Sequence, residues 1–302
     1  MTRPTDPLYS SQWHLAQIGD IERVWDYYAG NGVTVVVFDE GIETFHEDLN
    51  DNYVSGGGFI YSGTSFTSSY LSPSDGHGTS VAGVIAAEAN NGLGGVGVAW
   101  GAGGASLNFL EQVQLHSLGA VLASFQHAAN FDVMNNSWGF TPLYTSSQSL
   151  ANPTSEASQG EAALAYSAAN GRGGLGTIIV AAAGNDALNA NGDALTGTRL
   201  SVVVGAVDRY GNATSYSNWG ANLLVAAPDA AYTTDISGDG GYNGSGTADG
   251  DPLANVNYTS VFGGTSAAAP VVSGVIALML EANPGLGWRD VQREPSGLPS
   301  PQ

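Results

Sequence analysis

Residues 33–43, VTVVVFDEGIE, combine an apolar run of strand length with an acid, Asp39, that directly follows it. Two further segments place His77 and Ser266 at the start of helix-like runs: DGHGTSVAGVIAA (75–87) and GGTSAAAPVVSGVIALML (263–280). Polar residues that end a buried strand or begin a buried helix lie where they can be held at the rim of a core. The pattern therefore predicts three chemically active side chains around one core.

An acid, an imidazole and a hydroxyl form the set with which a general base activates a nucleophile. Along this chain they come in the order Asp39, His77, Ser266. Unrelated folds carry such a triad, and each threads it along the chain in its own order. The Asp–His–Ser order found here is one of those known orders, so it favours a serine nucleophile activated by histidine.

Apolar runs of strand length alternate with Ala-rich stretches of helical length. The strand-like runs are 33–38, 105–110, 132–136, 177–183, 201–207 and 223–228, and the helical stretches are 78–90, 112–130, 158–171 and 266–282. Several runs are apolar on both faces, as strands covered by helices on both sides are. The sequence predicts an α/β fold in three layers, with a mostly parallel sheet and helices on both faces. Sites in such sheets lie beyond the carboxyl ends of strands, where Asp39 and Asn185 stand.

The chain reads as one domain, a catalytic unit over residues 1–292, followed by a tail at 293–302 that contains three prolines. Residues 229–259 are rich in Gly, Asp and Asn and are interpreted as a long surface excursion. Residues 140–157 are interpreted in the same way.

Composition excludes several classes of function. The net charge is −20, and the seven basic residues are all arginines. Nucleic acid and anionic membrane both require a basic surface, so neither is expected as a partner. The absence of cysteine excludes disulfides and thiol chemistry. The first 13 residues do not resemble a signal peptide, and the apolar stretch 270–282 is too short to span a bilayer. We expect a monomer.

Each active residue also has an ordinary structural interpretation. Ser266 resembles a helix N-cap, although Pro270 inside the same helical pattern is an odd choice for a purely structural helix. The nucleophile elbow G-x-S-x-G is not met, because Ala268 stands in place of its second glycine, and this disfavours an α/β-hydrolase, esterase or lipase.

His77 alone is more often a satisfied structural histidine, and the zinc-type spacing around it is absent. A helix N-terminus disfavours a charged imidazole, which suits a neutral base. Asp39 and Asn185 are both ordinary turn residues in isolation. Beside a His–Ser pair, the acid would orient the imidazole, and the Asn185 amide could donate to a developing oxyanion.

Six motifs together resemble the catalytic domain of a subtilisin-like serine protease, and most of all its kexin/furin branch. They are TDPLYSSQWHL (5–15), DEGIETFHEDL (39–49), DGHGTSVAGVIAAEANNGLGGVGVAW (75–100), NNSWG (135–139), GRGGLGTIIVAAAGN (171–185) and GGTSAAAPVVSGVIALMLEANPGLGWRDVQ (263–292). The resemblance implies Ser266 as nucleophile, His77 as general base and acid, Asp39 as its orienting group and Asn185 as oxyanion donor.

The resemblance also implies how a substrate binds. The edge formed by Ser137, Trp138 and Gly139 would pair with a protein or peptide substrate in extended form, by strand addition. Asp193 is the candidate match for one carboxylate of the first specificity pocket.

A calcium site is a further implication of the resemblance. Asp6, Asp48 and Asn91 match its side-chain ligands, and the carbonyl groups of Glu88, Leu93 and Gly95 match its backbone ligands. Such hard oxygen donors, with two carboxylates, suit Ca²⁺. The alternative is that Asp6 and Asp48 are ordinary solvated turn acids.

The chain departs from the furin pattern around the specificity pocket. Phe140, Thr141 and Pro142 follow the strand edge where acidic residues are expected, and Ser217-Asn218 stands in place of another calcium carboxylate. A broader endopeptidase is therefore as well supported as cleavage after paired basic residues. We expect a secreted enzyme, and the sequence leaves open whether it is a fragment or is exported through a C-terminal signal. A catalytically silent peptide-binding module is the alternative, although no triad residue is lost.

Overall fold

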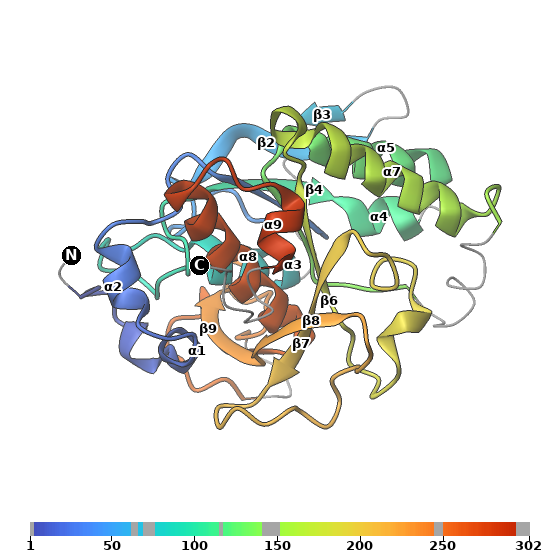
Figure 1. The fold of residues 1–302 in the computed structure, drawn as a ribbon. Coiled ribbons are helices and arrows are strands. Elements are labelled where there is room, and N and C mark those ends of the chain that lie inside the picture. The colour runs from blue at the N-terminus through green and yellow to red at the C-terminus, as the bar shows by residue number, and fades with distance from the viewer. Residues whose placement is uncertain are drawn as a thin grey trace, which may run out of the picture.

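Parallel strands form the centre of the fold. A computed structural model describes residues 3–61, 66–68, 76–114, 117–140, 152–244 and 250–293. Eight strands make one sheet in the order β3-β2-β4-β1-β5-β6-β7-β8 (Figure 1). All neighbours pair in parallel except β2 and β3. The strands are β1 (Thr34–Asp39), β2 (Tyr53–Tyr61), β3 (Phe66–Ser68), β4 (Gly103–Asn108), β5 (Val133–Asn136), β6 (Ile178–Ala182), β7 (Ser201–Val207) and β8 (Leu223–Pro228). The predicted α/β class is confirmed.

Helices cover both faces of this sheet (Figure 1). One face carries α3 (His77–Ala86) and α8 (Thr265–Ala282). The other carries α4 (Phe109–Gln114), α5 (Leu118–His127) and α7 (Glu156–Asn170). Shorter helices lie at the ends of the chain: α1 (Trp13–Gln17), α2 (Ile21–Trp25) and α9 (Trp288–Arg293).

The strand β1 shows why the sequence folds into three layers. Its side chains alternate between the two faces: Val35 and Val37 belong to the core under α3 and α8, and Val36 and Phe38 belong to the core under α5 and α7. All four are almost completely buried. A strand buried on both faces has no polar position in its interior, so the polar side chains of β1 are at its two ends, Thr34 and Asp39.

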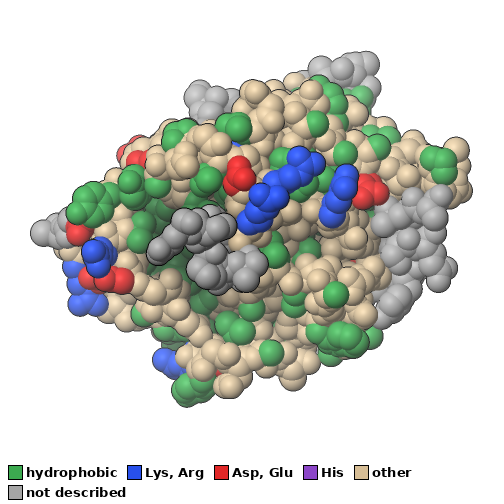
Figure 2. All heavy atoms as spheres, in the orientation of Figure 1, with side chains coloured by type: hydrophobic (Ala, Val, Ile, Leu, Met, Phe, Trp, Pro, Cys, Tyr) green, Lys and Arg blue, Asp and Glu red, His purple; other side chains and the backbone are tan. Residues whose placement is uncertain are grey.

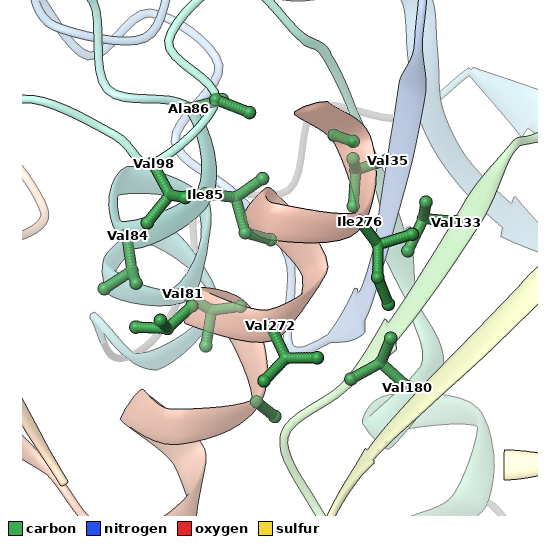
Figure 3. Packing of buried hydrophobic residues seen from close by; sticks show 14 of the residues in the cluster. Val35, Val81, Val84, Ile85, Ala86, Val98, Val133, Val180, Val272 and Ile276 are labelled. Carbon is green, nitrogen blue, oxygen red and sulfur yellow. The ribbon is translucent and has the colours of Figure 1, made fainter. Parts of the chain in front are cut away.

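The helix α8 lies between α3 and the sheet. Figure 3 shows Val272 and Ile276 of α8 placed between Val81 of α3 and the strand residues Val133 and Val180. Within the described residues, α8 has the length and hydropathy of a membrane span, but 72% of it is buried inside the protein. It is therefore a core helix, as expected from the sequence.

Several predicted elements have different boundaries, among them the helical stretch 78–90, which ends at Ala86. The strand-like run 105–110 ends at Asn108, because Phe109 already begins α4. The helical stretch 112–130 is divided between α4, α5 and a 3-10 turn at Ala128–Asn130. Residues 115–116, between the two helices, lie outside the described residues, as do 141–151 of the expected Ser/Thr-rich excursion and 294–302 of the expected tail.

The expected surface excursion at 229–259 begins instead with a buried strand. β9 (Ala230–Thr234) pairs in antiparallel fashion with β10 (Tyr258–Gly263). Thr233 and Thr234 donate their hydroxyls to the carbonyls of Ser80 and Thr79 in α3, and Thr234 accepts the Ser80 hydroxyl. The interpretation of this segment as surface was wrong at its first residues, because these polar side chains satisfy helix carbonyls in the interior.

The face of the molecule seen in Figure 2 is dominated by uncharged side chains, and arginine side chains gather on it near α9. Two of the seven arginines, Arg289 and Arg293, belong to α9, and both are exposed. The net charge of the whole chain, with all seven arginines counted, is −20.

We expect two helical glycines to respond in opposite ways to substitution by alanine. A Cβ at Gly83 would overlap the hydroxyl oxygens of Thr233 and Thr234, whereas a Cβ at Gly119 in α5 meets open space. Gly119→Ala should stabilise the protein by about 0.5–1 kcal/mol through helix propensity, and Gly83→Ala should destabilise it by about 1–3 kcal/mol through overpacking. Urea unfolding of both variants tests this, and a gain of stability in Gly83→Ala would contradict it.

His14 of α1 makes the stability of the fold depend on pH. Its ring is fully buried, neither nitrogen has a partner among the described residues, and burial lowers its pKa from 6.5 to about 3. Between these two pKa values the unfolded chain binds the extra proton, so stability falls as the pH falls. We expect a loss of about 2–3 kcal/mol from this residue between pH 7 and 4.5. Urea unfolding at both pH values should show a smaller loss in His14→Phe, and equal losses would refute the assignment.

Candidate active site

The carboxyl ends of neighbouring strands bring the predicted residues to one edge of the sheet. β1, β5 and β6 are adjacent in the sheet. Asp39 is the last residue of β1, Ser137 follows β5, and Asn185 follows β6 after a short turn. The N-termini of α3 and α8 add His77 and Ser266. This is the edge at which parallel sheets place their ligand sites.

Asp39 and His77 form a direct hydrogen-bonded pair. The His77 Nδ1 lies 2.9 Å from Oδ1 and 3.0 Å from Oδ2 of Asp39, whose side chain is fully buried. The Asp39 Oδ1 also accepts the backbone N–H of Glu40 at 2.9 Å. Gly78 allows this approach, since a Cβ at its position would overlap the carbonyl oxygen of Gly41. With Nδ1 facing the acid, Nε2 is the ring nitrogen on the side away from Asp39.

The ring of His77 also packs against the segment that leads into α8. Its centroid lies 5.5 Å from that of Phe262 in an edge-on arrangement. Phe262 is buried and packs in turn against Tyr242. This aromatic contact fixes the plane of the imidazole, whose side chain keeps 22% of its surface exposed.

Ser266 and Ser137 exchange two hydrogen bonds. The Ser266 hydroxyl donates to the Ser137 carbonyl, and the Ser137 hydroxyl donates to the Ser266 carbonyl, both at 3.0 Å. Within an α-helix the Ser266 carbonyl would accept the N–H of residue 270. Residue 270 is Pro270, which has no N–H. The proline that looked odd in the sequence therefore frees a carbonyl group that ties α8 to the end of β5.

A buried polar chain continues behind Ser137. Asn135 donates its Nδ2 to the Ser137 hydroxyl at 3.0 Å, and its Oδ1 accepts the hydroxyl of Ser273 at 2.8 Å. Asn135 and Ser273 are fully buried. Because Ser266 and Ser273 lie on the same helix, these bonds set the register of α8 along β5.

Asn185 is held through its side-chain oxygen. Its Oδ1 accepts the backbone N–H of Thr265 at 2.9 Å and the Thr265 hydroxyl at 3.0 Å. The Thr265 hydroxyl also accepts the N–H of Gly184 at 3.1 Å. Asn185 is exposed, and with its oxygen occupied the amide N–H₂ group is the end that remains for a ligand next to Ser266.

The candidate substrate edge is the segment Ser137, Trp138 and Gly139. Among the described residues, no hydrogen bond engages the backbone N–H or C=O of Trp138 and Gly139. The Trp138 ring points inward: it stacks on Phe109 at 4.6 Å, and its Nε1 donates to the Phe38 carbonyl. The ring therefore anchors the segment without using its backbone groups, and strand addition requires backbone groups that can pair with a substrate.

Asp193 lies behind this edge rather than in open space. Its Oδ1 accepts the N–H groups of Leu195 and Thr196, and its Oδ2 accepts that of Phe140 at 2.7 Å. Burial raises its pKa, and these backbone N–H groups act in the opposite direction. Its assignment to the specificity pocket stays a prediction. Thr141 and Pro142 lie outside the described residues.

The loop after α3 gathers the residues predicted to bind calcium. Asp6 accepts the N–H groups of Asn90, Asn91 and Gly92, and Asn91 donates its Nδ2 to Oδ1 of Asp48 at 2.7 Å. Among the described residues, no hydrogen bond reaches the carbonyl oxygens of the three predicted backbone ligands, Glu88, Leu93 and Gly95.

Asp48 is the candidate calcium ligand whose negative charge is least compensated. It is fully buried, and its Oδ2 has no partner among the described residues. Burial, together with the carboxylates of Glu88, Asp6 and Glu47, raises its pKa to about 8. The described residues contain no cluster of three or more acidic or histidine side chains suited to a metal. The donor set, two carboxylates with amide and carbonyl oxygens, fits Ca²⁺.

Comparison with known proteins shows the family of the chain. Residues 30–294 match the model of the subtilase family, peptidase S8. The chain belongs to the subtilase family. The resemblance inferred from the six sequence motifs is thereby confirmed.

Among curated relatives, this subtilase chain is 34% identical over 300 residues to mouse proprotein convertase subtilisin/kexin type 7, covering 95% of this chain and 37% of the relative. It is 33% identical to human furin over 305 residues, covering 96% and 36%. It is 31% identical over 318 residues to a calcium-dependent protease of Nostoc sp., covering 94% and 45%. The chain thus spans little more than a third of the length of the first two relatives.

Solved structures show the same fold. The crystal structure of a serine protease of Aeromonas sobria superposes with a TM-score of 0.81 at 26% identity, covering 97% of this chain and 57% of that one. A protease of Pseudoalteromonas arctica has a TM-score of 0.73 at 27% identity, covering 96% and 90%.

Sequence reasoning overlooked several residues that support this subtilase site. Thr265 lies in the quoted G-T-S motif, and Asn135 lies in NNSWG. Ser273 could have been noticed as a polar residue inside the apolar run of α8. Phe262 gave no signal, because an aromatic residue before two glycines resembles any strand end.

Proposed function

We propose that this chain is a serine endopeptidase that cleaves peptide bonds through an acyl-enzyme. The observation that carries the proposal is the Asp39–His77 hydrogen bond at the sheet edge where Ser266 and Asn185 also lie. A buried acid on Nδ1 of a histidine fixes the tautomer and stabilises the imidazolium that forms during acyl transfer. The family membership of the chain supports the same chemistry.

In the proposed reaction, Ser266 attacks the scissile carbonyl carbon while His77 removes its hydroxyl proton through Nε2. The substrate oxygen becomes an oxyanion, and the Nδ2 of Asn185 donates to it. When the intermediate collapses, the C–N bond breaks and His77 passes its proton to the leaving amine. Water then attacks the acyl-enzyme with His77 as base, which releases the acid and restores Ser266. The Ser266 hydroxyl leaves the Ser137 carbonyl as this reaction begins.

The substrate would bind in extended form along the backbone of Trp138 and Gly139, whose N–H and C=O groups have no hydrogen-bond partner among the described residues. Backbone pairing gives affinity without selecting a side chain. Both oxygens of Asp193 already accept backbone N–H groups. This supports a broader specificity than cleavage after paired basic residues.

We further propose a resident Ca²⁺ held by Asp6, Asp48 and Asn91 together with the carbonyls of Glu88, Leu93 and Gly95. The buried, unpaired Oδ2 of Asp48 supports it, as does the similarity to a relative described as a calcium-dependent protease. The ion would neutralise Asp48. Through Asp6 it would also join the N-terminal segment to the loop after α3. A calcium requirement and a charge of −20 suit an enzyme that acts outside the cell, as a monomer on protein substrates.

Ser266→Ala should abolish labelling by a fluorophosphonate and lower the kcat of peptide hydrolysis on the order of 10⁶-fold, because no nucleophile remains. Ser167→Ala is the matched control: this buried helical serine in α7 donates to the Phe125 carbonyl, and its own carbonyl accepts the N–H of Thr177 just before β6, at the opposite end of that strand from Asn185. It should lose some stability and keep its labelling. If the folded wild type binds peptides without Ser266-dependent labelling, the chain is a silent binding module.

Removal of calcium should lower the thermal stability of the protein. A ligand at 100 times its dissociation constant contributes about 2.7 kcal/mol to the folded state. We expect calcium to raise the Tm of the chelator-treated wild type and to raise that of Asp48→Asn much less. Asp208→Asn, which changes an exposed turn acid elsewhere, should respond like the wild type. An equal response in all three proteins would remove the calcium proposal.

A further inference from the structure

Asn218 is a buried amide whose hydrogen-bonding groups are directed at the segment that carries Asn185. Its side-chain oxygen accepts the backbone N–H groups of Asp186 at 3.0 Å and Leu188 at 2.9 Å. Its side-chain nitrogen donates to the carbonyl of Ala183 at 2.9 Å. Only 2% of Asn218 is exposed. A single side chain therefore ties down the backbone on both sides of Asn185.

The backbone around Gly184 is shaped to fit this amide. The N–H of Asn218 donates to the Gly184 carbonyl at 2.8 Å. Gly184 has a φ of +97°, and a Cβ at its position would overlap the side-chain nitrogen of Asn218. Only glycine meets both conditions. The geometry of the turn and the position of the amide thus depend on each other.

Asn185 itself is anchored only through its neighbours and its side chain. Among the described residues, no hydrogen bond engages the backbone N–H or C=O of Asn185. Thr265 holds its side-chain oxygen. The place of its Cα is therefore set by the flanking residues, and the bonds from Asn218 fix those residues.

We propose that Asn218 is the positioning residue for Asn185, which aims the Asn185 amide at the substrate oxyanion. This inference rests on the proposed function. A donor stabilises a transition state only when it is held in advance at the place where charge develops, and a misplacement of about 1 Å costs about 10²-fold in rate. The oxyanion exists only after attack, so loss of position lowers kcat and leaves KM nearly unchanged.

The test is a double-mutant cycle over wild type, Asn185→Ala, Asn218→Ala and the double variant, with kcat and KM measured for one peptide substrate in calcium. We expect Asn218→Ala to lower kcat about 10–100-fold in the wild type and less than about 2-fold in Asn185→Ala, because residues that act as one unit are not additive. Asn218→Asp keeps the acceptor for Asp186 and Leu188 and should recover part of the kcat.

Gln12→Ala is the matched control. Gln12 is 3% exposed, and its amide also makes three bonds to backbone groups, with Val96 and Tyr232, in another part of the fold. It should lower stability and leave kcat unchanged. An equal loss of kcat in Gln12→Ala would overturn the proposal, as would the same fold-loss from Asn218→Ala in both backgrounds.

The experiments distinguish failure of the serine endopeptidase proposal from failure of the Asn218 proposal. If hydrolysis by the wild type does not depend on Ser266, the proposed function is wrong, and the role of Asn218 in positioning an oxyanion donor is wrong with it. Hydrogen exchange of the Asp186 and Leu188 amides then still decides whether Asn218 fixes the turn. Faster exchange in Asn218→Ala than in Gln12→Ala supports that fixation, and equal exchange overturns it.

Discussion

The carbonyl group that Pro270 leaves without a helical partner is the point on which the site depends. Ser137 donates to that carbonyl and receives the Ser266 hydroxyl in return. This exchange fixes the start of α8 against the end of β5, and the bond from Ser273 to Asn135 repeats the connection two turns along the helix. If α8 could slide by one residue, the proposed nucleophile Ser266 would lose its alignment with the proposed substrate edge. Hydrophobic packing alone is not directional, so the polar contacts set the register.

The apolar core supplies the other half of this arrangement. Packing of α8 between α3 and the sheet brings together two helices whose N-termini carry Ser266 and His77. The end of β1 adds Asp39. Three segments that are far apart along the chain therefore meet at one place in the fold. Each element contributes one terminal residue, because its interior positions are buried against the neighbouring layers. The chemistry is therefore confined to the rim by the same burial that stabilises the fold.

The sequence predicted the elements that are both long and strongly apolar, and it predicted the polar residues at their ends. It failed for β9, because Thr233 and Thr234 look like surface residues until their hydroxyls are seen to satisfy carbonyls of α3. In the sequence, Asn218 drew attention only because Ser217-Asn218 stands where a calcium-binding carboxylate is expected. Its partners, on both sides of Asn185, are more than 29 residues away along the chain. Hydrogen bonds of this kind leave no periodic pattern, so only the folded chain reveals them.

Asp193 and Asn218 show how chemistry and specificity separate in this site. Each is a polar side chain near the substrate region, yet each directs its oxygens at backbone N–H groups. A carboxylate occupied in this way has less capacity to pair with a basic substrate side chain, since its lone pairs already accept charge-assisted bonds. Both residues therefore hold backbone in place, Asp193 behind the proposed substrate edge and Asn218 beside the proposed oxyanion donor. Under the proposed function, the backbone at Trp138 and Gly139 would contribute affinity for any extended peptide, and other side chains would have to select among substrates.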